Sequence, residues 1–99
     1  MFIPLERLIN LDEGYKRGFS VAGKHLLLIV DQGQHLLFED RCPHQGAPLH
    51  TGTLQAGVLR CPRHGLAFDV HSGRPQQGVC GSLIRWPLAY DGDRLGVDL

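Results

Sequence analysis

Short apolar runs separated by turn-forming residues make up most of the chain. Runs rich in Val, Ile, Leu and Phe predict β-strands at residues 18–22, 25–30, 35–39, 58–60, 67–70, 83–86 and 95–99. Turn residues at Asp31-Gln32-Gly33, Ser72-Gly73 and Asp91-Gly92-Asp93 favour hairpins between such runs. Only residues 5–11 have a spacing compatible with a short helical turn. The pattern predicts an all-β fold of mainly antiparallel strands.

Residues 41–57 do not fit this pattern. The stretch holds two prolines, three glycines and two histidines and shows no sustained alternation of polar and apolar residues. A loop of this length inside a small protein usually has a function.

Composition narrows the range of functions. Ninety-nine residues with 42% hydrophobic content predict one domain, residues 1–99, with a single site. Ten basic and ten acidic residues cancel, so net charge does not suggest nucleic acid or an anionic membrane as a partner. The chain starts without a signal-peptide pattern, and no apolar run is long enough to span a membrane. Three cysteines, two of them just ahead of a histidine, fit metal ligation in a reducing compartment, and we expect a cytoplasmic protein.

Two Cys/His pairs carry the candidate chemistry. Cys42-Pro43-His44 is followed after 16 residues by Cys61-Pro62-Arg63-His64. Two thiolates and two imidazoles suit either a tetrahedral zinc site or an iron-sulfur centre, so ligand type alone leaves both open. Structural zinc sites usually place two cysteines before two histidines, whereas here the types alternate. A binuclear cluster accounts for the alternation, because each loop would supply one ligand to each iron.

The run from Cys42 to Gly73 resembles the Rieske motif, which is C-x-H, then about fifteen to seventeen residues, then C-x-x-H. The resemblance includes Gly46 and Ala47 after the first histidine, Gly65 after the second, and the Phe68-Asp69 to Ser72-Gly73 turn. We expect glycine at 46 and 65 because backbone N–H groups must approach the cluster sulfurs closely. The ending Trp86 to Asp93 is similar to the last hairpin of Rieske ferredoxins that serve aromatic-ring dioxygenases.

The resemblance implies a fold, a cofactor and a role. The fold would be an antiparallel β-sandwich with an inserted cluster-binding subdomain at about residues 41–73. One [2Fe-2S] cluster would be bound by Cys42 and Cys61 on one iron and by the Nδ1 atoms of His44 and His64 on the other. The protein would not be an enzyme. It would carry single electrons from a flavin reductase to a terminal oxygenase, docking near the histidines, with Pro48, Pro62, Gly65 and Leu66 as a rim.

The resemblance also implies a low reduction potential. High-potential relatives carry an extra cysteine in each loop, where this chain has Ala47 and Arg63, and hydroxyl donors where it has Leu66 and Phe68. The potential should therefore lie near the lower end of the Rieske range, roughly −150 mV, with Arg63 raising it slightly. Family members often have a proline in a third loop, whereas this chain reads Gly78-Val79-Cys80.

Three other functions share part of this pattern. A small subunit of a nitrite reductase would have the same fold, and a structural zinc module would have the same ligands. A catalytic oxygenase would need a second iron site of two histidines and a carboxylate, for which we expect no room in 99 residues. No functional role is expected for the other candidate residues. Cys80 should be a free thiol, Trp86 should be a core residue, and surface histidines are expected at His25, His35, His50 and His71.

Overall fold

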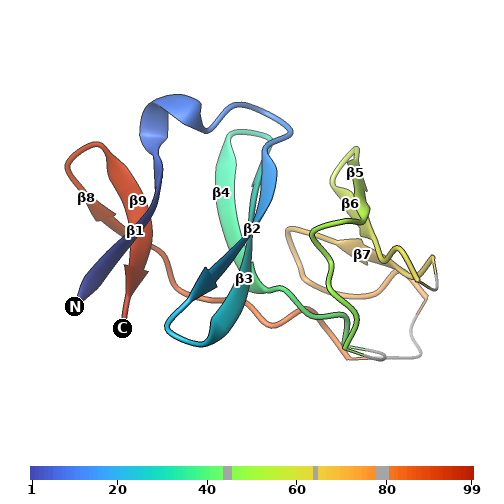
Figure 1. Cartoon of the computed structure of the whole chain (residues 1–99). Coiled ribbons are helices and arrows are strands. Elements are labelled where there is room, and N and C mark those ends of the chain that lie inside the picture. Colours follow the sequence, from blue (N-terminus) through green and yellow to red (C-terminus); the bar gives the residue numbers. More distant parts are fainter. Residues whose placement is uncertain (44–45, 64, 78–80) are drawn as a thin grey trace.

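A computed structural model describes all of the chain except residues 44–45, 64 and 78–80. In the described part the strands pair into three antiparallel sheets, ordered β1-β9-β8, β2-β3-β4 and β5-β6-β7 (Figure 1). The elements are β1 (Phe2–Arg7), the 3-10 turn η1 (Leu8–Asn10), β2 (Lys16–Val21), β3 (Lys24–Asp31), β4 (Gln34–Glu39), β5 (Thr53–Gln55), β6 (Val58–Arg60), β7 (Ala67–Asp69), β8 (Ala89–Asp91) and β9 (Arg94–Asp98). The predicted all-β, antiparallel fold is confirmed.

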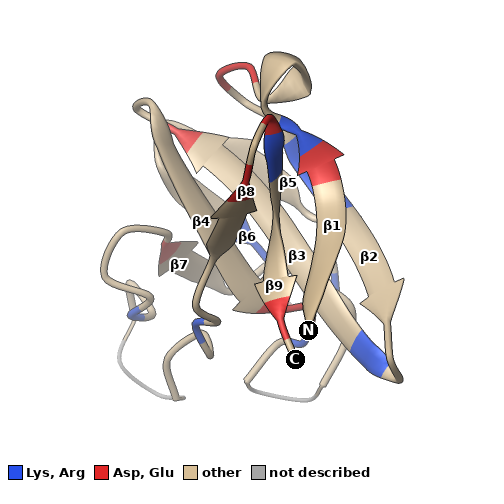
Figure 2. Ribbon diagram, turned by 90° about the vertical axis from the view of Figure 1, so that its left-hand side faces the viewer, with Lys and Arg blue, Asp and Glu red and all other residues tan. Residues whose placement is uncertain are grey.

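The β2-β3-β4 sheet lies between the other two sheets, so β3 is buried on both faces (Figure 1). Leu27 and Ile29 belong to a cluster shared with the sheet β5-β6-β7, whereas Leu26 and Leu28 belong to a second cluster shared with β9. Successive strand residues point to opposite faces, and an unbroken apolar run therefore suits a central strand. Figure 2, turned by 90°, shows β1, β9 and β8 in front of the central sheet.

Most predicted strands are present with shifted ends, but residues 83–86 are not a strand. Arg85 makes only an isolated bridge to Phe38. The strands β1, β5 and β8 were missed. Two of them have three residues, and β1 contains Pro4 and a shift of register against β9, which hides its alternation. The predicted helical turn over 5–11 is shorter, since residues up to Arg7 belong to β1 and only η1 is helical.

Tight hairpins explain the strand connections. The loop between β3 and β4 is Gln32-Gly33, and both residues have positive φ (53° and 72°), as a type I′ turn requires.

In the described part of the chain, no helix has the length and apolar character needed to cross a membrane.

Candidate metal centre

The two cysteine loops, residues 42–47 and 61–66, close in the same way. The Cys42 carbonyl accepts the Gly46 N–H at 2.7 Å, and the Cys42 N–H donates to the Ala47 carbonyl at 2.8 Å. In the second loop, the Cys61 carbonyl accepts the Gly65 N–H at 3.0 Å, and the Cys61 N–H donates to the Leu66 carbonyl at 2.8 Å. The two loops therefore have the same length and are closed by the same pair of backbone hydrogen bonds, although their motifs differ (C-x-H and C-x-x-H).

The glycine at the fifth position of each loop has a conformational reason. Gly46 and Gly65 have φ of +74° and +68°, in the left-handed region that other residues adopt at a cost. No described atom lies within 4 Å of a Cβ built on Gly65, and the nearest to one on Gly46 is the Arg41 Nε at 3.2 Å. The left-handed φ therefore gives both glycines a conformational reason, and the close approach to cluster sulfurs expected from the sequence stays a prediction.

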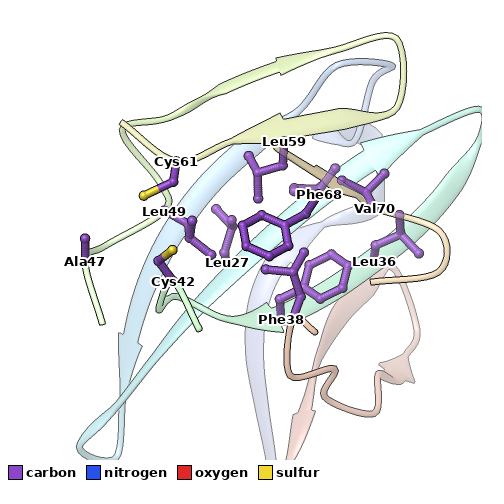
Figure 3. Close-up of a cluster of buried hydrophobic side chains, with 12 residues drawn as sticks. Leu27, Leu36, Phe38, Cys42, Ala47, Leu49, Leu59, Cys61, Phe68 and Val70 are labelled. Carbon is purple, nitrogen blue, oxygen red and sulfur yellow. The ribbon is translucent and has the colours of Figure 1, made fainter. Parts of the chain in front are cut away.

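Both cysteines are buried and belong to the core. Cys42 is 0% and Cys61 is 1% exposed, and both lie in the cluster that contains Leu49, Leu59 and Phe68. Figure 3 shows the two sulfur atoms at the same edge of this cluster. His44 and His64, the other two predicted ligands, lie outside the described residues, as do Gln45 and Gly78-Val79-Cys80 of the predicted third loop.

A carboxylate that sequence reasoning missed supports the first loop. Asp40 Oδ1 accepts the backbone N–H of Leu49 at 2.7 Å and that of His50 at 2.9 Å, and Asp40 Oδ2 lies 2.6 Å from His50 Nδ1. Lys16 Nζ also donates to the His50 carbonyl. His50 therefore helps to fix the chain on either side of the loop, although we expected a histidine without a role. A carboxylate just before a turn-rich segment is the signal that could have found this contact.

The second loop has a different support, since Arg60 Nη1 donates to the Gly65 carbonyl at 2.8 Å. Gly52 fits beside the same strand, because a Cβ there would lie 2.2 Å from the Arg60 carbonyl oxygen. The residue before Cys61 is therefore held by its side chain and by close packing of its backbone.

His71 also has a structural role that its sequence position did not reveal. Its Nε2 lies 2.7 Å from Asp31 Oδ2 and its Nδ1 lies 3.0 Å from Gln34 Oε1, across the gap between the turn after β7 and the β3–β4 hairpin. His25 is exposed as expected, whereas His35 Nδ1 lies 2.9 Å from the Tyr90 hydroxyl oxygen. Trp86 is half-buried and packs at the margin of the second cluster, so it is not a fully buried core residue.

A hollow of about 500 Å³ lies beside the first loop. Its lining includes Cys42, Pro43 and Gly46, and it is completed by Gly81, Ser82 and Ile84 from the segment before Trp86. Among the described residues, no three His, Cys, Asp or Glu side chains converge. Two buried thiols at the heads of matching loops are nevertheless a donor set that suits iron or zinc.

Comparison with known proteins decides between these metals. A family model described as the Rieske [2Fe-2S] domain matches residues 2–85. The chain belongs to this family. Its cofactor is a Rieske-type [2Fe-2S] cluster, and the two cysteine loops fit that group because thiolates bind the irons of such clusters.

Curated relatives of the Rieske chain include proteins of very different length. The ferredoxin component of the naphthalene 1,2-dioxygenase system of Pseudomonas aeruginosa is 31% identical over 99 residues, covering 99% of this chain and 95% of that protein. Apoptosis-inducing factor 3 of Mus musculus is 38% identical over 64 residues, which are 65% of this chain. The match spans only 11% of the mouse protein, so the family recurs inside much larger proteins.

Solved structures agree with the fold. The ferredoxin of carbazole 1,9a-dioxygenase from Nocardioides aromaticivorans IC177 has a TM-score of 0.81 and 25% identity, covering 97% of this chain and 95% of that one. A chain in a complex of reduced oxygenase and oxidized ferredoxin in carbazole 1,9a-dioxygenase has a TM-score of 0.81 and 27% identity, covering 94% of this chain and 97% of that one.

Proposed function

We propose that this Rieske protein is a low-potential ferredoxin, a carrier that takes single electrons from a flavin reductase and delivers them to a terminal oxygenase. The observation that carries the proposal is the pair of matching loops, each headed by a buried cysteine, in a chain that aligns along almost its whole length with a dioxygenase ferredoxin. The bound cluster supplies one reversible electron. The chain holds the cluster and presents it, and has no catalytic residues of its own.

In this proposal the cluster ligands are Cys42, His44, Cys61 and His64, within a cluster-binding part at about residues 41–73 of a single domain, 1–99. Burial of both cysteines keeps water away from the iron that they would bind. Pro48, Pro62 and Gly65 are exposed and Leu66 is half-buried, as suits a docking rim beside the histidines. Because metal-bound cysteines are typical of reducing compartments, we place the carrier in the cytoplasm.

The test begins with the anaerobically purified holoprotein. Iron, zinc and acid-labile sulfide are counted on one sample, and the dithionite-reduced protein is examined by electron paramagnetic resonance. We expect about two irons and two sulfides per chain and a rhombic signal with an average g below the free-electron value. Colourless protein that holds zinc and no sulfide, even after iron-sulfur reconstitution, would exclude the proposed carrier.

Matched variants then test the ligand set. Cys61→Ser and His64→Gln should each abolish the rhombic signal, whereas Cys80→Ser and His25→Gln should keep it, because neither control residue is a proposed ligand. Retention of an unchanged signal in His64→Gln would disprove the proposed outer ligands.

A small subunit of a nitrite reductase is the second candidate function, because it would have the same fold and cluster. The partner distinguishes the two. Reduced protein should be reoxidised by a terminal oxygenase encoded beside its gene, at a rate that depends on its concentration. Reoxidation only by a neighbouring nitrite reductase would favour the second candidate.

A further inference from the structure

Charge is divided unequally between two parts of the molecule, although the total is zero. We call residues 41–85 the cluster lobe and residues 1–40 with 86–99 the base. The cluster lobe carries five arginines and one aspartate, a formal charge of +4. The base carries five basic and nine acidic residues, a formal charge of −4. Figure 2 shows acidic segments on β1, β8 and β9 and basic segments in the loops beside β7.

Ion pairing follows the same division. In the base, Arg7 and Arg94 pair with Asp93, and Arg17 pairs with Glu6. Within the described part of the chain, no arginine of the cluster lobe takes part in an ion pair, and the residues outside that part include no carboxylate. All five are exposed: Arg41, Arg60, Arg63, Arg74 and Arg85.

Three of these five arginines lie at the two cysteine loops. Arg41 precedes Cys42, and its guanidinium lies against Gly46. Arg60 is bonded to the Gly65 carbonyl, and Arg63 stands inside the second loop. Asp69 is the one carboxylate of the cluster lobe, and its Oδ1 accepts the backbone N–H groups of His71 and Ser72. Asp40 and Asp31, from the base, are half-buried or buried and face His50 and His71. A protein that approaches the loops therefore meets mainly positive charge.

Distance keeps the negative base from cancelling this field. The molecule extends 40 Å along its longest axis. The screening length at physiological ionic strength is about 8 Å. Opposite ends are therefore screened from each other, and each acts on its surroundings with its own sign.

We propose that the cluster lobe is a cationic docking surface for an acidic patch on the redox partner. The proposal rests on the proposed function and adds the charge of the partner. Ile84, which is 54% exposed, lines the hollow beside Cys42 and Pro43. An apolar centre within a charged rim is typical of a protein interface and favours an acidic protein over a nucleic acid as the occupant.

The first test uses small oxidants of opposite charge in place of the partner. Reduced holoprotein is mixed in stopped flow with hexacyanoferrate(III) or with tris(phenanthroline)cobalt(III), and one electron passes from the cluster to the metal of the oxidant. As ionic strength rises, the rate with the anionic oxidant should fall and the rate with the cationic oxidant should rise. The opposite pattern, or no dependence with either oxidant, would contradict a cationic lobe.

Variants that each remove two positive charges show which part of the molecule causes the dependence on oxidant charge. Arg63→Gln with Arg74→Gln removes two charges from the cluster lobe, and Arg7→Gln with Arg94→Gln removes two from the base. At low ionic strength, the first pair should slow the anionic oxidant by roughly three- to tenfold, for charges about 10 Å from the cluster. The second should change the rate by on the order of 1.3-fold at about 30 Å. Equal effects of the two pairs would overturn the proposal.

A second test does not depend on electron transfer. Poly-L-glutamate, as a model acidic protein surface, and a DNA duplex are titrated into ¹⁵N-labelled oxidised protein at 0.15 M salt. Poly-L-glutamate should shift amide signals of the turn Asp69–Arg74 and leave those of β8 and β9 unchanged. Shifts confined to the base, or binding of DNA alone, would contradict the proposal. If the iron and sulfide counts exclude the cluster but poly-L-glutamate still causes the expected shifts, the proposed function fails and the docking surface stands. If the cluster is present but the shifts are absent, only the docking surface fails.

Discussion

Gly65 shows how one residue can determine the shape of a metal loop. Its φ of +68° disfavours every side chain, and no described atom lies near the space that a Cβ would fill. Gly65→Ala should therefore lower the free energy of unfolding by about 1 kcal/mol through backbone strain alone. Urea denaturation of the holoprotein measures this loss. Gly81→Ala is the control, because its Cβ would meet Pro43 at 3.8 Å, an ordinary contact, and an equal loss in both variants would contradict the explanation.

Tyr15 should make stability depend on alkaline pH. Burial, followed by the hydrogen bond from its hydroxyl to Glu6 Oε2 at 2.8 Å, raises the pKa of Tyr15 to about 12. Because the folded-state pKa is raised, its contribution is complete below the ordinary pKa of about 10 and is lost as pH rises to about 12.

Tyr15→Phe should cost about 1 kcal/mol at pH 7 and remove this alkaline loss. Urea denaturation of both proteins from pH 7 to pH 11.5 gives the two slopes. Tyr90→Phe, at an exposed position, should cost less. A Tyr15→Phe variant with wild-type stability and an unchanged slope would show that the hydroxyl makes no net contribution.

At the scale of elements, His71 connects the sheet that carries the second cysteine loop to the β3–β4 hairpin. Its removal in His71→Ala would leave the Asp31 carboxylate, 10% exposed, without its imidazole partner. We expect a loss of about 1–3 kcal/mol in the free energy of unfolding and faster amide exchange in the turn after β7. His25→Ala is the matched control at an exposed position. Equal exchange in both variants would mean that His71 does not connect the two elements.

The elements differ in how well the sequence predicts them. β3, β4, β6 and β9 carry their own apolar pattern and were predicted nearly to their ends. β5 and β8 are too short for a period to be recognised, and they exist because a partner strand supplies their hydrogen bonds. The loop predicted over residues 41–57 is therefore interrupted by β5.

The site was predictable in its chemistry and less so in its support. Spacing and residue type pointed to Cys42 and Cys61, and the structure places both, buried, at the start of two loops that close in the same way. Asp40 and Arg60 support the loops through side-chain hydrogen bonds to backbone groups nine and five residues further along the chain, and His71 contacts Asp31, 40 residues before it. Apolar periodicity and ligand spacing do not contain such side-chain contacts. As cluster ligands, Cys42, His44, Cys61 and His64 all stay predictions.

For the molecule as a whole, net charge was a poor guide. Ten basic and ten acidic residues suggested no electrostatic preference, yet the fold places a charge of +4 around the cysteine loops and −4 in the base. The sum hides this because it has no spatial information. The division could be seen in the sequence only after the limits of the cluster lobe were known.

The same distribution should tune the reduction potential, because a reduced cluster carries one more negative charge. A unit charge about 10 Å away in water-like surroundings contributes about 0.4 kcal/mol, or about 20 mV for one electron. Arg63→Gln should therefore lower the reduction potential of the cluster by about 20 mV at low ionic strength, from a value of about −150 mV.

Voltammetry of the two matched variants measures this effect. Arg94→Gln removes the same charge from β9 in the base and should leave the potential unchanged. Raising the salt to about 1 M, where the screening length is about 3 Å, should abolish the difference between the variants. A shift that persists in high salt would instead indicate that Arg63→Gln alters the second loop itself, and equal shifts in both variants would show that position within the fold does not matter.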